Sequence, residues 1–260
     1  MSTALAAPIR LSAAGTDARP SVGRLVAVEL RKMVDTRAGL WMQVATVVFT
    51  ALVVILRSVV GDAADHTFAA VLNIAVKPAA VLLPVAGILL VTSEWSQRTG
   101  MITFALVPVR SRVLGAKLIA SLLLALAALV MAVAVVAAGV LVASPGVEGT
   151  WSDAAALIGQ SAVFLTTGMV VGVAFGAVLL ASAPAVVALS ALPIAWTAAA
   201  SLSFFAGAAP WLDTRLALAP LHHEVLSATQ WAHAGTALAV WMVLPLLIGI
   251  WRITRQEVAS

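Results

Sequence analysis

The sequence predicts an all-α membrane protein that crosses the bilayer six times. Of its 260 residues, 62% are hydrophobic and 10% are charged, whereas about 25% of the residues of an average soluble domain are charged. The mean hydropathy is +1.09. One helical span needs about 20 apolar residues, so a chain of this length holds about six spans. These observations exclude a soluble globular domain and a disordered chain.

The chain before the first apolar segment divides into two parts. Residues 1–20 are rich in Ala, Ser, Pro and Gly and lack the layout of a signal peptide, so we expect a flexible cytoplasmic tail. Residues 21–38 are amphipathic at helical spacing. Their apolar side chains share one side and their charged side chains the other: Val22, Leu25, Val26, Leu30 and Met33 against Arg24, Arg31, Lys32 and Asp35. We expect this helix to lie in the membrane interface, with its basic side toward anionic headgroups.

Six apolar segments follow within residues 39–252, and residues 253–260 form a second predicted cytoplasmic tail. The expected spans are Leu40–Leu56, Phe68–Ser93, Leu118–Val142, Ala154–Ala181, Pro184–Phe205 and Ala234–Trp251. Because only Ser182-Ala183-Pro184 joins the fourth to the fifth, we expect these two to form an antiparallel pair. Proline removes a helical hydrogen bond, so Pro84 and Pro193 are expected to break the second and fifth spans.

The distribution of basic residues predicts the orientation. Twelve of the fifteen lysines and arginines lie in the N-terminal stretch, the loop after the second span or the C-terminal tail. Arg57, Lys77 and Arg215 lie on the opposite side, together with all four histidines. Under the positive-inside rule both termini are cytoplasmic. The net charge of +4 therefore reflects topology, and no nucleic-acid partner is expected.

Few groups inside the predicted spans could carry out chemistry. Enzymes and proton-driven carriers need ionisable side chains at depth, and no Asp or Glu lies well inside any of the six segments. Cysteine is absent, which excludes thiolate catalysis and cysteine-based metal sites. The deepest charge is Lys77, about 24 Å from Ser93 along a helix. Its side chain either extends to the outer headgroups or lines a substrate path.

Two further patterns have a plain structural interpretation beside a functional one. His222, His223 and Glu224, with His233 nearby, suggest a metal site, but adjacent helical residues point in different directions. We therefore expect a polar outer loop and no metal. Gly168, Gly172 and Gly176 recur every fourth residue in the fourth span. Such a row permits close helix packing, within the chain or against a second subunit.

The loop at about 94–117 is the most informative stretch. Glu94 opposes the dipole at the C-terminal end of a helix, so we expect a compensating cation, from Arg98 or from another chain. The apolar residues that follow either lie against the bilayer or receive a soluble partner; they are Met101, Ile102, Phe104, Leu106 and Val107.

A resemblance to a known family is carried by about thirty residues. The second span ends in Ser93-Glu94-Trp95, followed by Arg98-Thr99-Gly100, and Pro108-x-Arg110-x-Arg112-Val-Leu-x-x-Lys117 opens the third. This pattern resembles the permease subunits of bacterial type-2 ABC exporters. Glu29-Leu30-Arg31-Lys32 is similar to the N-terminal segment of the same family.

The resemblance implies a complex of two permease subunits, identical or different, with two ATP-binding subunits in the bacterial cytoplasmic membrane. ATP and Mg would be bound by the partner. Glu29, Arg31 and Lys32 would belong to a connecting helix, and Glu94, Arg98, Thr99, Arg110 and Arg112 to a coupling loop that touches the ATPase. The cargo would be a hydrophobic or amphipathic drug, natural product, peptide or lipid.

The sequence itself is consistent with ATP hydrolysis on a separate subunit. The chain has no phosphate-binding G-x-x-x-x-G-K-[ST] loop, so we expect no enzymatic activity on it. Two alternatives stay open. A membrane scaffold would have the same composition, and a secondary transporter would be favoured by broken half-helices at matching positions of two repeats.

Overall fold

The computed structural model describes residues 20–60, 66–96, 110–147, 149–205, 207–222 and 224–255. Within these ranges six helices are long and apolar enough to cross a membrane. They comprise α2 (Arg37–Val59), α3 (Phe68–Ala75) with α4 (Lys77–Ser96), α6 (Arg110–Ala143), α7 (Ala154–Leu179), α8 (Ser182–Ala200), and α11 (Ala228–Leu238) with α12 (Leu244–Arg255). A π-helical turn at Ala239–Val243 joins α11 to α12. The chain is therefore a multi-pass membrane protein.

Side-chain caps begin several of these helices. Ser21 accepts a hydrogen bond from Arg24 at the start of α1 (Val22–Asp35), and Thr36 accepts one from Gly39 at the start of α2. Ser227 and Gln230 form a reciprocal capping box on α11. Ser and Thr occupy these positions because their hydroxyl oxygens satisfy backbone N–H groups that have no partner within the helix.

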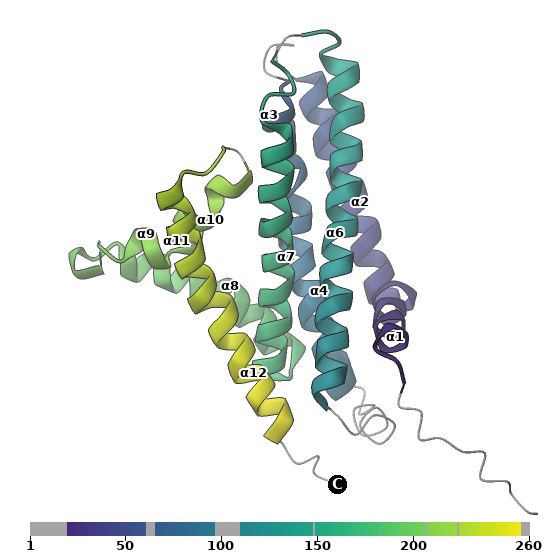
Figure 1. Ribbon diagram of the computed structural model, residues 1–260, viewed down its shortest axis with the longest axis vertical. Helices are drawn as coiled ribbons and strands as arrows, with labels where there is room; N and C mark the ends of the chain where they lie inside the picture. The colour runs from purple at the N-terminus through teal and green to yellow at the C-terminus, as the bar shows by residue number, and fades with distance from the viewer. Residues whose placement is uncertain are drawn as a thin grey trace, which may run out of the picture.

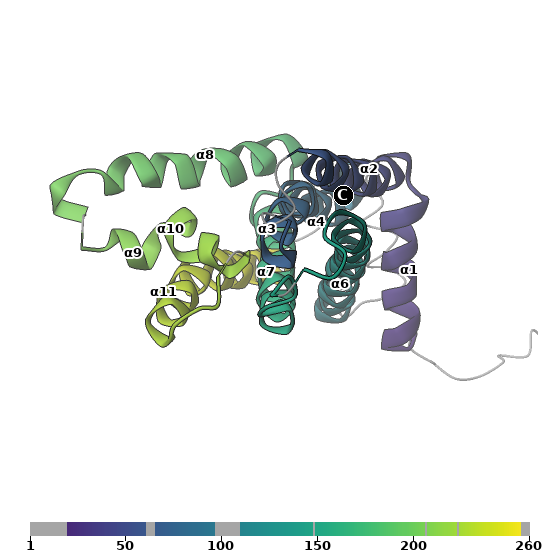
Figure 2. The ribbon, with the colours of Figure 1, turned by 90° about the horizontal axis from the view of Figure 1, so that it is seen from above.

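Long helices form the main bundle, and α1 lies across one end of it. Helices α2, α3–α4, α6 and α7 run along the long axis (Figure 1), whereas α1 is seen side-on when the bundle is viewed from above (Figure 2). The end of α4, the start of α6 and the end of α12 lie at the same end as α1. We call this the α1 end.

Helices α4 and α7 make the closest contact in the bundle. A Cβ atom on Gly172 would lie 1.9 Å from the carbonyl oxygen of Pro84, and one on Gly87 would lie 2.6 Å from that of Met169. The two backbones therefore touch, which only glycine permits. Gly176 faces Ile88 in the same way, and Gly168 faces the Pro84 ring more loosely. The glycine row packs within the chain.

We expect Gly172→Ala to destabilise the protein by about 1–3 kcal/mol or more, because the added methyl group forces α4 and α7 apart. Gly159→Ala, in the same helix with open space around it, is the matched control. This variant should be neutral or slightly stabilising, since alanine favours helix. Thermal unfolding in a bilayer mimetic measures both. Equal melting temperatures for the two variants would contradict the close contact.

Three elements differ from the sequence-based prediction. The second span is interrupted between Ala75 and Lys77, where Pro78 has no N–H to continue the helical bonding. The expected breaks at Pro84 and Pro193 are wrong, since both prolines lie inside continuous helices. Helix α6 begins at Arg110, eight residues before the predicted apolar segment, because its first two turns are basic and the prediction began at the apolar run.

The fifth span departs from the expected antiparallel pairing. Helix α8 begins at Ser182, three residues after α7 ends at Leu179, and the Ser182 hydroxyl lies 2.7 Å from that of Thr92 on α4. It then runs steeply away from the bundle axis (Figures 1 and 2). The short turn fixes only how near the two helix ends are, and leaves the angle between the helices to their packing.

Residues from α8 to α12 form an arm that contacts α7 at two levels. Near the α1 end, Gly249 of α12 packs against Ala177. Toward the other end, the buried Gln160 side chain donates to the carbonyls of Leu221 and Glu224 at 3.2 and 2.5 Å and accepts from Leu226 at 2.9 Å. These contacts hold the segment before α11 against the bundle. The arm includes two short helices, α9 (Ala209–Leu212) and α10 (Thr214–Leu218).

Candidate functional site

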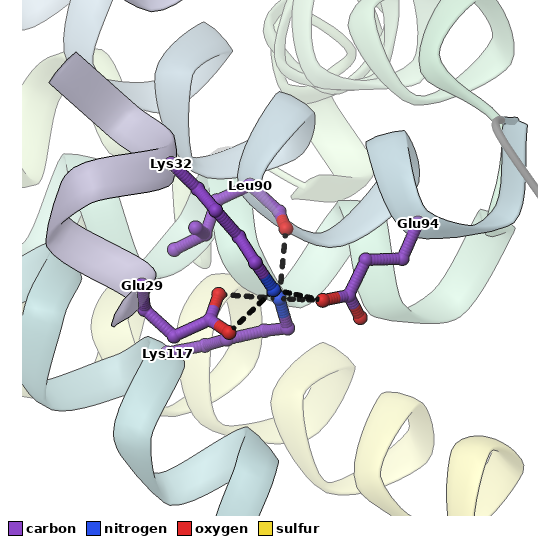
Figure 3. Close-up of polar contacts among 5 residues, drawn as sticks. All are labelled: Glu29, Lys32, Leu90, Glu94 and Lys117. Atoms are coloured by element: carbon purple, nitrogen blue, oxygen red, sulfur yellow. Dashed lines mark hydrogen bonds and ion pairs between the residues drawn. The ribbon is translucent and has the colours of Figure 1, made fainter. Parts of the chain in front are cut away.

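Four charged side chains from three helices meet at the α1 end of the bundle (Figure 3). Glu29 and Lys32 come from α1, Glu94 from the last turns of α4, and Lys117 from the third turn of α6. Glu29 is on the buried side of α1 with Val26 and Met33. We call these four residues the charge cluster.

Each acid of the charge cluster contacts both bases. Lys32 Nζ lies 2.8 Å from Glu29 Oε1 and 2.6 Å from Glu94 Oε1. Lys117 Nζ lies 2.6 Å from Glu29 Oε2 and 2.9 Å from Glu94 Oε1. Lys117 also donates to the carbonyl oxygen of Leu90 at 3.2 Å. The cluster is therefore a closed set of alternating charges that links α1, α4 and α6.

Burial makes this arrangement a constraint on the fold. Glu29, Glu94 and Lys117 are 4%, 5% and 2% exposed. Removing charges from water is costly unless opposite charges and hydrogen bonds replace the lost hydration. The two acids and two bases neutralise one another, so none of the three helices can leave without exposing an unpaired charge in an apolar surrounding.

Lys32 is the half-exposed member of the cluster, with its ammonium group directed at Glu29 and Glu94. Burial lowers the pKa of its ammonium group, but the hydrogen bonds and negative charges of Glu29 and Glu94 outweigh this effect. The pKa is therefore raised above the ordinary value of 10.5. Lys32 carries its positive charge throughout the physiological pH range.

The cation that compensates Glu94 comes from within the chain. We expected this cation to come from Arg98 or from another chain, whereas Lys32 and Lys117 fill this role. Arg98 and Thr99 lie outside the described residues, and so does the side chain of Arg110. Lys117 was overlooked as a site residue, although it closes the Pro108–Lys117 motif. Its position between the basic loop and the apolar run was the available signal.

The remaining predicted contacts lie near the cluster. Arg31 is exposed on α1. Arg112, in the first turn of α6, donates from Nη2 to the carbonyl oxygen of Pro20 at 2.9 Å. This bond ties the start of α6 to the residue that precedes the cap of α1. Both ends of the segment 97–109 are therefore joined to α1, through Glu94 on one side and through Lys117 and Arg112 on the other.

Cavities lie between the bundle and the arm. The larger, of about 820 Å³, is lined by polar and apolar side chains of α8, α10 and Phe164, including Asp213 and Arg215. The buried Asp213 accepts hydrogen bonds from Thr197 Oγ1 at 2.9 Å and from the backbone N–H of Arg215 at 2.8 Å. A smaller, apolar cavity of about 170 Å³ reaches Pro84 and Gly168 at the α4–α7 contact.

The other two sequence-derived candidates have distinct surroundings. Lys77 is exposed at the break between α3 and α4. In the described parts of the chain, no three His, Cys, Asp or Glu side chains gather as a metal site would require. His223 and the side chain of His222 lie outside those parts.

No protein-family model matches the chain, and no curated protein matches its sequence. The assignment of a function therefore depends on the geometry of the chain itself.

We expect Lys117→Met to lower the free energy of unfolding by about 3–5 kcal/mol, because it leaves two buried carboxylates opposite a single lysine. Combining it with Glu29→Gln restores the neutrality of the cluster. The double variant should therefore lose less unfolding free energy than the sum of the losses of the two single variants. Arg31→Met, on an exposed cation of α1, should stay within about 0.5 kcal/mol of the wild type. Similar losses for Lys117→Met and Arg31→Met would show that the cluster does not hold the helices.

The raised pKa of Lys32 predicts a pH dependence. A base with a raised folded-state pKa stabilises the fold fully below its ordinary pKa of 10.5, and this stabilisation is lost as the pH rises through the higher folded value. The melting-temperature difference between wild type and Lys32→Met should therefore be constant from neutral pH to about pH 10 and shrink above it. A difference that shrinks already near neutral pH would contradict the pairing.

Proposed function

We propose that the chain is the membrane-spanning permease subunit of an ATP-driven exporter, with ATP hydrolysed by a separate subunit. The observation that carries the proposal is the charge cluster, which joins the amphipathic helix α1 to α4 and α6. These are the two helices that flank segment 97–109. A partner that moves α1 or this segment moves the ends of α4 and α6 with it.

The packing of the bundle connects movement at this end to the cavities. Helix α4 touches α7 backbone to backbone at Gly87 and Gly172. The apolar cavity at Pro84 and Gly168 adjoins the same contact. Closely packed interiors transmit displacement because they have little free volume to absorb it. Movement of α4 therefore changes the space between α7 and the arm, which is where a cargo would pass.

Orientation follows from the charge distribution. The α1 end carries the basic stretches of the sequence, so under the positive-inside rule it faces the cytoplasm. An ATP-binding subunit on that side would meet the exposed face of α1, including Arg31, and segment 97–109. The cluster residues Glu29, Glu94 and Lys117 are buried. The exposed side chains contact the partner, and these buried residues transmit its movement to α4 and α6.

The decisive experiment is affinity purification of the tagged chain from its native membranes in mild detergent. We expect an ATP-hydrolysing subunit to co-purify in a fixed ratio with the wild type. Arg31→Glu, which reverses charge on the exposed face of α1, should reduce its recovery several-fold. Arg215→Glu, on α10 far from α1, is the matched control and should leave the recovery unchanged.

Transmission of movement through the charge cluster can be tested separately from binding of the ATP-hydrolysing subunit. The double variant Glu29→Gln with Lys117→Met keeps the cluster neutral but removes the ion pair between α1 and α6. It should still bind the ATP-hydrolysing subunit through the exposed face of α1, but the ATPase rate of the complex should no longer depend on the permease. Recovery of no such subunit with the wild type, under conditions that preserve other membrane complexes, would overturn the proposal. That result would favour a scaffold or an ion-driven carrier.

A further inference from the structure

In the described part of the chain, a buried carboxylate with no paired cation lines the larger of the cavities between bundle and arm. Asp213 is 3% exposed and is the one acid among the described residues that line this cavity. The ion pairs of the described residues all lie in the charge cluster. A buried charge is costly unless an opposite charge or hydrogen bonds replace its hydration.

Hydrogen bonds stabilise the negative charge of Asp213 and leave one acceptor position open. Oδ1 accepts from the backbone N–H groups of Arg215 and Leu216 at 2.8 and 3.4 Å, and Oδ2 accepts from Thr197 Oγ1 at 2.9 Å. Backbone N–H groups bind an ionised carboxylate more strongly than a neutral one. Because a carboxylate has about four acceptor positions, Oδ2 can accept one further donor.

Arg215 lines the same cavity but does not neutralise Asp213. The two side chains form no ion pair, although the residues are two positions apart. Arg215 is exposed, and a long basic side chain can keep its charged end in water while its stem covers apolar surface. Its charge therefore needs no partner inside the cavity. Of the two charges that line the cavity, the buried one is negative.

The smaller cavity adjoins the carboxylate and adds an apolar compartment. Phe164, Thr214 and Leu218 line both cavities, and Thr214 directly follows Asp213. None of the described residues around the smaller cavity is charged. Its volume of about 170 Å³ is close to the roughly 150 Å³ of a buried apolar cavity that takes up benzene. The smaller cavity therefore fits an apolar group about the size of one aromatic ring.

We propose that the two cavities together bind an amphipathic amine, with its ammonium group at Asp213 Oδ2 and its apolar group in the smaller cavity. An ammonium group supplies both the donor that Oδ2 can accept and the positive charge that the buried carboxylate lacks. The uncharged walls of the smaller cavity match the apolar group. This inference rests on the proposed function, for which it names the class of cargo.

Binding to the purified full-length chain in nanodiscs of dioleoyl phosphatidylcholine tests the proposal. The ligand is tritiated 4-phenylbutylamine, and the competitors are unlabelled 4-phenylbutylamine and 4-phenylbutanol, which share the apolar part and differ in charge at the polar end. We expect the amine to bind saturably and the alcohol to compete at least about tenfold more weakly, because the alcohol lacks the charge-assisted hydrogen bond. Equal competition, or no saturable binding of the amine, would overturn the proposal.

Asp213→Asn removes the charge but keeps the start of α10, because asparagine caps helices as well as aspartate does. In this variant the amine and the alcohol should compete equally. Arg215→Gln, which removes the other charge that lines the larger cavity, is the matched control and should keep the preference for the amine. A preference that survives Asp213→Asn, or one that is lost in Arg215→Gln, would contradict the assignment of the carboxylate.

Val171→Phe tests the apolar compartment, since Val171 lines the smaller cavity. The larger side chain should weaken both competitors several-fold and leave their ratio unchanged. Unchanged competition by both would contradict the placement of the apolar group.

The binding assay contains no ATP-hydrolysing subunit, so it separates this inference from the proposed function. Amine binding that responds to these variants, in a chain with which no such subunit co-purifies, would refute export and leave the binding site in place. Co-purification of the subunit together with equal competition by the amine and the alcohol would refute the binding site alone.

Discussion

Two buried carboxylates must remain opposite two ammonium groups, one buried and one half-exposed, and this requirement organises the α1 end of the molecule. Their four ion pairs span 2.6–2.9 Å. An apolar contact tolerates small sliding, but a buried ion pair that separates leaves each charge unsolvated. Helices α1, α4 and α6 are thereby held as one unit, although they come from three separate parts of the sequence.

The second constraint is the contact of α4 with α7, which makes the unit continuous with the rest of the bundle. Glycines on both helices remove the side chains that would keep the backbones apart. Charge fixes the α1 end and close packing fixes the middle, while α8 runs away from the bundle (Figure 1) and cavities lie between bundle and arm. The proposed transport role requires such an arrangement, in which tightly packed helices lie beside cavities.

The candidate site shows how far local sequence patterns reach. The dipole argument at Glu94 required a nearby cation, yet its two partners are 62 and 23 positions away in the sequence. Helical periodicity placed Val26 and Met33 on the buried side of α1, but it gave no reason to place a carboxylate between them. Glu29 lies there because Lys117 reaches it from α6, a contact that exists only after the helices have packed.

Composition and hydropathy alone determined the all-helical, multi-pass architecture, since a bilayer admits few backbones other than a helix of sufficient length. The positions where the helices begin also depend largely on nearby sequence, because capping side chains act within four residues. Tertiary structure decided the divergence of α8 and the partners of the buried charges in the cluster. Angles between helices and long-range ion pairs depend on which surfaces meet, and neither spacing nor hydropathy encodes that.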